Sequence, residues 1–179
     1  LNGMKSEMHQ RAFLSIRKLL ALAGYTDFDL EYDIFGKPHL VDHNYISITH
    51  SHHFSAIIVS NEPVGIDIEM QREKILKIAH KFVNDEELNR LQQTDSAEYI
   101  KKLTVKWGAK EAIYKMKNEK GISFKDHIRV APFELNETPT LANLSYGGVE
   151  EKFDIHFSEL DTNFTLVYAF QNNSSNQLH

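Results

Sequence analysis

Hydrophobic residues recur at helical spacing near the start of the chain and again through its middle. The first such series consists of Phe13, Ile16, Leu19, Leu20 and Ala23. Gly24 follows it at the position where glycine commonly ends a helix, which predicts a helix over residues 8–23. The same spacing predicts further helices over 75–82, from about residue 84, and over 97–117.

Short apolar or alternating runs bounded by turn residues lie before and after these helices. They predict strands over 30–34, 45–49, 54–60, 64–70, 128–130, 153–157 and 164–170. The segment Gly36-Lys37-Pro38 predicts a turn or loop, and Gly147-Gly148 predicts a hairpin over 143–150. Strands, then helices, then strands indicate an α+β fold and not a regular βαβ series.

The amino-acid composition argues against several classes of function. The chain has 179 residues, 41% hydrophobic and 25% charged, which is typical of one folded globular body. Its apolar runs are too short to span a bilayer, and no secretory signal is seen, so we expect no membrane partner. The absence of cysteine excludes thiol chemistry and fits a reducing cytosol, so a cytoplasmic location is expected. The net charge of −5 argues against nucleic acid as a partner.

The predicted strand over 64–70 carries two acidic residues on one face. Because side chains alternate along a strand, Gly65, Asp67 and Glu69 share one face, and the apolar residues share the other. Carboxylates this close repel each other unless a cation or protons lie between them. A Mg²⁺ ion with oxygen ligands fits that arrangement. The alternative is an edge strand with a solvated acidic face.

A third acidic residue lies on the predicted helix over 97–117. Its apolar stripe consists of Ile100, Leu103, Trp107 and Tyr114. Glu111 falls inside this stripe, where a carboxylate is costly unless it is paired or bound to metal. Lys115 follows four residues later, in the favourable order for a pair. An ordinary surface pair is the alternative.

Two further charged features have weaker implications. His50, His52 and His53 suggest zinc, but no second ligand cluster accompanies them, and His50 at the end of a strand beside hydroxyls suits a phosphate. Residues 101–129 hold nine Lys or Arg against three Asp or Glu. That excess predicts a positive patch that attracts an acidic partner, unless these lysines simply form a solvated helix face.

Four segments together resemble a known family. They are Phe35–Pro38, Ser47–Ser51, Val64–Glu69 and Trp107–Lys115. They are similar to the Gly-Lys-Pro loop, the Ser-His-Ser strand end, the Gly-Ile-Asp-Ile-Glu motif and the Trp-x-x-Lys-Glu-Ala-x-x-Lys motif of the 4'-phosphopantetheinyl transferase superfamily, surfactin-synthetase type. Thr49 replaces the usual Ser, and Gly108 stands where Ser, Thr or Cys is frequent. The resemblance runs from about Arg11 to Phe133.

The resemblance implies an α+β fold of two pseudo-two-fold related lobes, each a small antiparallel sheet packed with helices. The expected boundaries are an N-terminal lobe over 1–62, possibly without its natural start, a C-terminal lobe over 63–170 with the metal and catalytic motifs, and a frayed tail over 171–179. Such a chain is expected to be a monomer.

It also implies transfer of the phosphopantetheine arm of coenzyme A to a serine of an apo acyl or peptidyl carrier protein, with Mg²⁺. In that reaction Asp67, Glu69 and Glu111 would hold the metal, Glu111 would act as base, and Lys115 would stabilise the leaving group. Coenzyme A contacts are implied for Gly36, Lys37, Pro38, Thr49, His50, Lys110, Lys115 and Arg17, with Thr49 and His50 at the 3'-phosphate.

Two other functions remain open at this point. One is a Mg²⁺-dependent nuclease or phosphohydrolase, although such nucleases place a lysine two residues after the acid, where Gln71 stands here. The other is a non-catalytic module that binds coenzyme A or a carrier protein. Turnover of coenzyme A distinguishes both from the transferase.

Overall fold

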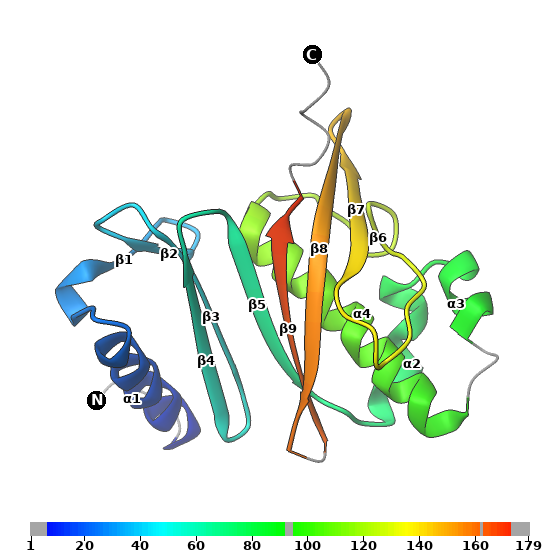
Figure 1. Cartoon of the computed structure of the whole chain (residues 1–179), viewed down its shortest axis with the longest axis horizontal. Helices are drawn as coiled ribbons and strands as arrows, with labels where there is room; N and C mark the ends of the chain where they lie inside the picture. Colours follow the sequence, from blue (N-terminus) through cyan, green and yellow to red (C-terminus); the bar gives the residue numbers. More distant parts are fainter. Residues whose placement is uncertain (1–6, 92–94, 162, 173–179) are drawn as a thin grey trace.

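The computed structural model describes residues 7–91, 95–161 and 163–172. Its elements form an N-terminal part, residues 7–62, and a larger C-terminal part, residues 63–172. Figure 1 shows the N-terminal part as a helix beside short strands, and the C-terminal part as a sheet with a long helix behind it. The structure is therefore a mixed α+β fold with antiparallel strands, as the sequence predicts.

The N-terminal part consists of one helix and two strand pairs. Its elements are α1 (Glu7–Leu22), the 3₁₀ turn η1 (Asp27–Asp29), β1 (Leu30–Tyr32), β2 (Pro38–Leu40), β3 (Tyr45–Ser51) and β4 (Phe54–Ser60). Strand β1 pairs with β2, and β3 with β4, both antiparallel. Gly24 has a φ of 88° after α1, the left-handed conformation that ends many helices.

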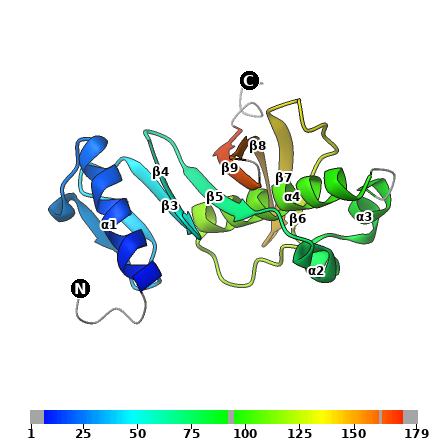
Figure 2. The ribbon, with the colours of Figure 1, turned by 90° about the horizontal axis from the view of Figure 1, so that it is seen from below.

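The C-terminal part is built on one antiparallel sheet. Its elements are β5 (Val64–Met70), α2 (Lys74–Phe82), α3 (Asp85–Leu91), α4 (Ser96–Lys117), β6 (Ile128–Val130), β7 (Thr140–Tyr146), β8 (Val149–Leu160) and β9 (Phe164–Gln171). The strand order is β5-β9-β8-β7-β6, and α4 crosses one face of this sheet (Figures 1 and 2). None of the described helices is long and apolar enough to cross a membrane.

The predicted elements are confirmed, with small corrections at their ends. Pro38 begins β2 instead of lying in a loop, β1 ends at Tyr32, and β8 is much longer than the predicted 153–157. The prediction of a frayed tail is wrong for Gln171 and Asn172, because Gln171 ends β9 and the Asn172 amide donates to the Lys152 carbonyl. The rest of the tail and the start at Leu1 lie outside the described residues.

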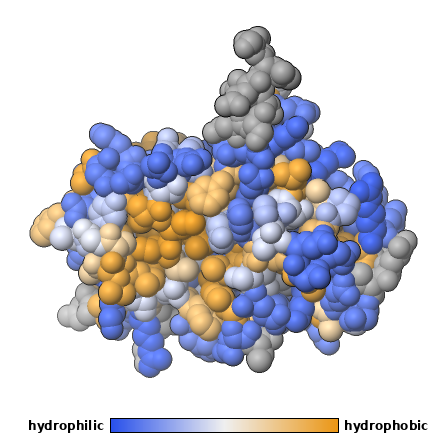
Figure 3. Space-filling model, viewed as in Figure 1, coloured by the Kyte–Doolittle hydropathy of each residue, from blue (hydrophilic) through white to orange (hydrophobic). Residues whose placement is uncertain are grey.

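The main hydrophobic core lies between α4 and the five-stranded sheet. It includes Val105, Ile113, Phe153 and Ile155, all 2% exposed or less. The N-terminal part has a much smaller core around Leu20. Figure 3 shows more hydrophobic surface over the N-terminal part, on its left, than over the C-terminal part. The two parts thus differ in sheet size and core, and the expected pseudo-two-fold relation is not shown by the described residues.

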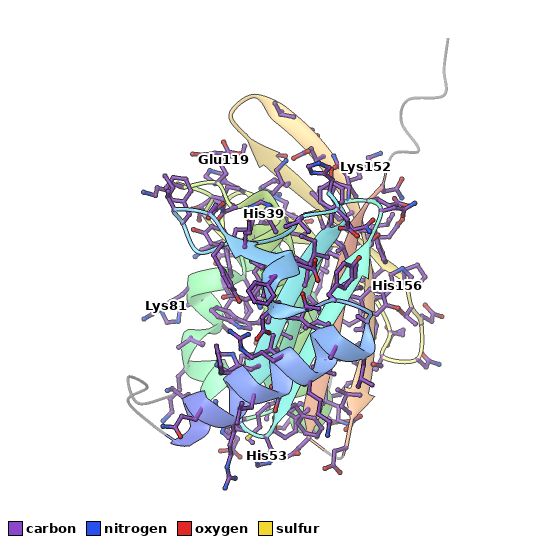
Figure 4. All side chains as sticks on the ribbon, turned by 90° about the vertical axis from the view of Figure 1, so that its left-hand side faces the viewer. His39, His53, Lys81, Glu119, Lys152 and His156 are labelled. Atoms are coloured by element: carbon purple, nitrogen blue, oxygen red, sulfur yellow. The ribbon has the colours of Figure 1, made fainter. Side chains whose placement is uncertain are left out.

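Strand β3 lies along the free edge of β5 and joins the two parts. Ser47 faces Ile66, and Thr49 faces Ile68, so the two strands run in the same direction. At the tip of the β3–β4 hairpin, His53 packs against Phe164, with their ring centroids 5.8 Å apart. Figure 4 shows His53 at the bottom of the view and His39 in its upper half.

Strand β5 approaches α4 closely because it carries a glycine at the contact. A Cβ atom on Gly65 would lie 1.9 Å from the backbone oxygen of Ala112. Any other residue would therefore push the strand away from the helix. Gly65 thus brings the acidic face of β5 against α4.

Candidate functional site

Asp67 lies at the centre of the site, between β3, α4 and β9. The residue is only 4% exposed. The Lys115 ammonium donates to Asp67 Oδ1 at 2.7 Å, and the Thr49 hydroxyl donates to the same oxygen at 3.4 Å. The other oxygen, Oδ2, is buried and has no hydrogen-bond partner among the described residues. A buried carboxylate oxygen without a partner is costly, so it is open to a further ligand.

Glu69 and Glu111 complete the acidic face that the sequence predicts. The Trp107 indole donates to Glu69 Oε1 at 3.3 Å, whereas the Glu111 carboxylate has no hydrogen bond within the described ranges. Burial, together with the nearby Asp67 charge, raises the pKa of Glu111 to about 7, although Lys115 acts in the opposite direction. Burial also raises the pKa values of Asp67 and Glu69. The site therefore holds more negative charge than its single lysine can balance.

Lys115 does not form the helical pair with Glu111 that the spacing suggests. Its ammonium turns instead to Asp67 and to the Ile66 carbonyl, at 2.7 and 3.0 Å. The reason is that Lys115 finds two acceptors together at the free edge of β5, the buried Asp67 carboxylate and the Ile66 carbonyl. These two acceptors bind its ammonium more strongly than the partly exposed Glu111 carboxylate would.

The acidic side chains fit a divalent cation in their chemistry. No three His, Cys, Asp or Glu side chains converge closely enough to hold a metal ion in the part of the chain that the structure describes. Asp67 is turned toward Lys115 and Glu69 toward Trp107. However, a hard cation that prefers oxygen ligands would supply the partner that Asp67 Oδ2 lacks among the described residues. It would also stabilise the charged forms of the three carboxyl groups, whose pKa values are raised.

Lys110 is not brought to this site, which corrects its assignment to coenzyme A. It is fully buried on another side of α4, where its ammonium donates to Glu87 at 3.1 Å and to the carbonyls of Phe82 and Phe124. Lys106 also donates to Glu87, at 2.9 Å. Residues 110 and 111 are about 100° apart around a helix, so they face different neighbours.

The Gly36-Lys37-Pro38 segment lies at the C-terminal end of α4. The Lys37 ammonium donates to the Met116 carbonyl at 2.7 Å, where it satisfies a free carbonyl of the last helical turn. Gly36 has a φ of 84°, which turns the chain there. Burial lowers the pKa of Lys37.

A groove of about 660 Å³ adjoins this segment and lies between the two parts. Its lining includes Lys37, Pro38, Ile46, Val64, Met116 and Lys117. A smaller hollow of about 170 Å³ lies near the other end of β5, beside Glu69, Met70 and Trp107. Strand β5 therefore connects the two hollows, with Asp67 between them.

The structure separates Thr49, His50 and Arg17. Thr49 is buried against β5, whereas the next residue, His50, is exposed on the opposite face of β3. Their side chains thus do not point at one common ligand. Arg17 on α1 pairs with Asp27 and lies over the Phe13 ring, at 4.0 Å from the centroid, and its buried Nε has no partner among the described residues.

The positive patch predicted over 101–129 is not formed. Lys102, Lys106 and Lys110 are buried and paired. Lys101 and Lys117 bind Glu159 and Glu151. The count of charges in the sequence was correct, but most of these cations are neutralised by acidic residues from other segments.

Two side chains in the site were not assigned a role from the sequence. Trp107 lies on the same helical stripe as Glu111, and that position was enough to place its indole beside an acidic residue. Ser47 and Thr49 lie two residues apart, so their hydroxyls share one face of β3. Two hydroxyls on one face of a strand could have indicated that this face makes polar contacts.

Comparison with known proteins agrees with this geometry. A family model described as the 4'-phosphopantetheinyl transferase superfamily matches residues 63–169, which include the whole acidic face. This chain belongs to that superfamily. It is also similar to the 4'-phosphopantetheinyl transferase gsp of Aneurinibacillus migulanus, with 33% identity over 81 residues. That match covers 45% of this chain and 34% of the relative, so it spans about a third of the relative's length. The resemblance seen in the motifs is confirmed.

Proposed function

We propose that the protein transfers the 4'-phosphopantetheine arm of coenzyme A to a serine of an apo acyl or peptidyl carrier protein. The observation that carries this proposal is the acidic face of β5 and α4. Three carboxylates with raised pKa values lie near one lysine, which pairs with Asp67, and a buried oxygen of Asp67 has no partner among the described residues. These residues lie within the stretch that the superfamily model matches, in the two segments that resemble the family's motifs.

In this proposal Asp67, Glu69 and Glu111 hold Mg²⁺. The ion would neutralise the pyrophosphate of coenzyme A as negative charge develops on the leaving group. Lys115 would also stabilise the charge on the leaving group, once a phosphate of coenzyme A replaces Asp67 as the partner of its ammonium. The groove beside Lys37 and the hollow beside Glu69 suit an elongated substrate that passes Asp67. The two-lobed arrangement with a pseudo-two-fold axis is part of the same proposal.

Glu111 is proposed as the base. Its carboxylate has no hydrogen bond among the described residues, so its oxygens are available to accept a proton, and without a bound cation its pKa is raised to about 7. It would take the proton of the carrier serine. The serine oxygen then forms a bond to the phosphorus that carries the pantetheine arm. The bond from that phosphorus to the bridging oxygen breaks, and adenosine 3',5'-bisphosphate leaves with the electron pair.

The test is intact-mass spectrometry of an apo acyl carrier protein incubated with this protein, coenzyme A and Mg²⁺. We expect a gain of about 340 Da, the mass of the transferred arm, and its loss when EDTA removes the metal. Binding of coenzyme A without any gain on several carriers would favour a non-catalytic module. No binding of coenzyme A would refute the proposal and favour a metal-dependent phosphohydrolase.

A further inference from the structure

Ser47 and Thr49 occupy equivalent positions on β3. Both are buried, and both accept a hydrogen bond from a backbone amide of β5. The Ile66 amide donates to the Ser47 hydroxyl at 3.1 Å, and the Ile68 amide donates to the Thr49 hydroxyl at 3.2 Å. These amides lie on the edge of β5 that faces away from β9, so the two hydroxyls take the place of a neighbouring strand.

The two hydroxyls differ in one contact. Thr49 also donates to Asp67 Oδ1, at 3.4 Å, whereas Ser47 contacts none of the three acidic side chains. Because the Thr49 oxygen already accepts from a backbone amide, its proton is directed at the carboxylate. At 3.4 Å this bond is longer than the about 2.5–3.0 Å typical of O–H···O hydrogen bonds.

Both donors to Asp67 meet the same oxygen. Thr49 approaches Oδ1 from β3, and Lys115 approaches it from α4. The carboxylate is thereby held in one orientation, with Oδ2 buried and without a partner among the described residues. A carboxylate held in this way presents one oxygen to a cation without first having to be reoriented.

We propose that Thr49 is a positioning residue for Asp67, which keeps Oδ2 available to a divalent cation. The N-terminal part thus completes a metal site whose ligands all belong to the C-terminal part. This inference rests on the proposed function, since it takes Asp67 as a metal ligand. It gives Thr49 a different role from the 3'-phosphate contact, because its one hydroxyl proton is already committed to Asp67.

The experiment compares Mn²⁺ binding, without coenzyme A, for the wild-type protein and three variants. Thr49→Val keeps the shape but removes the hydroxyl, and we expect it to weaken Mn²⁺ binding about tenfold, as loss of a group that orients a ligand commonly does. Thr49→Ser should restore binding to within about twofold. Ser47→Ala is the matched control: it removes the equivalent bond to β5 and should leave Mn²⁺ affinity unchanged.

A second measurement separates positioning from phosphate recognition. The ratio of the dissociation constants of coenzyme A and 3'-dephospho-coenzyme A should be the same for Thr49→Val as for the wild type. A selective loss of coenzyme A affinity would instead assign Thr49 to the 3'-phosphate and overturn the proposal. Wild-type Mn²⁺ affinity in Thr49→Val would overturn it too.

The remaining outcomes separate the role of Thr49 from the existence of the metal site on which that role depends. If Ser47→Ala weakens Mn²⁺ binding as much as Thr49→Val does, attachment of β3 to β5 is responsible and the specific role of Thr49 is refuted. If the wild-type protein binds no Mn²⁺, the metal site itself is refuted, and the positioning role with it. Only that last outcome contradicts the proposed function.

Discussion

Helix α4 carries two buried polar clusters on different sides, and their charges are balanced in opposite ways. In the Glu87 cluster, formed by Glu87, Lys106 and Lys110, one carboxylate meets two ammonium groups, and backbone carbonyls accept further hydrogen bonds from both lysines. In the acidic site, formed by Asp67, Glu69, Glu111 and Lys115, three carboxylates lie near one ammonium, which pairs with Asp67. Burial alone would raise the pKa of Glu87, but its two lysines lower it.

The difference shows which cluster is complete. The Glu87 amide and carboxylate also bond to Asn84 and to the Val130 amide, so that side chain joins α3, α4 and β6. Such a cluster stabilises the fold, because all its polar groups are satisfied. The acidic site leaves Asp67 Oδ2 without a partner in the part of the chain that the structure describes, and it raises the pKa of all three carboxyl groups. A site of this kind needs a ligand to become balanced.

The largest expected effect is on transfer. Glu111→Gln removes the proposed base while keeping its size, so transfer to a carrier protein should fall about a thousandfold. The folded structure should persist, because that carboxylate makes no hydrogen bond among the described residues. Rates of holo-carrier formation measure this, with the exposed Glu119→Gln as the matched control. A rate near that of the wild type would remove Glu111 as the base.

The next effect is on stability and concerns the complete cluster. Glu87→Gln leaves two buried ammonium groups without a counter-charge, which should cost about 3 kcal/mol of the free energy of unfolding. Urea denaturation measures it. The control is Glu134→Gln, because its partner Lys102 keeps Glu98, and the change should stay within about 0.5 kcal/mol. Equal stability of the two variants would contradict the distinction between the clusters.

The smallest effect is a pH-dependent stabilisation by metal. With raised carboxyl pKa values, the folded protein binds protons more tightly than the unfolded chain up to about pH 7, so stability falls as the pH rises through that range. Mg²⁺ competes with these protons. We expect it to stabilise the protein by about 1.4 kcal/mol at ten times its Kd at pH 8, and by less at pH 6.

Thermal denaturation at both pH values checks this last expectation, with potassium chloride at matched ionic strength as the control. Glu111→Gln should flatten the dependence of stability on pH, because it removes the carboxyl whose pKa is raised to about 7. Equal stabilisation by Mg²⁺ at pH 6 and pH 8 would show that the cation does not bind at these carboxylates.

The comparison of the two clusters also shows how much of the side-chain pairing can be predicted from local sequence patterns. Lys110 and Lys115 both belong to the helical motif, and their positions on the helix were predictable from its period. Their partners were not. Glu87 lies 23 residues from Lys110, and Asp67 lies 48 residues from Lys115. Pairing at such separations depends on how α3 and β5 pack on α4, which no local pattern contains.

The face of its element that each acidic residue occupies could be predicted from local sequence patterns alone. Alternation placed Asp67 and Glu69 together, the helical stripe placed Glu111 toward the core, and Gly147-Gly148 marked the β7–β8 hairpin. These features follow from backbone geometry, which repeats over a few residues. The packing of distant elements, in contrast, pairs Lys115 with Asp67 and Lys110 with Glu87, and it brings Thr49 on β3 against the acidic strand. The reason is that a buried charge takes the partner that packing brings within reach, wherever that partner lies in the chain.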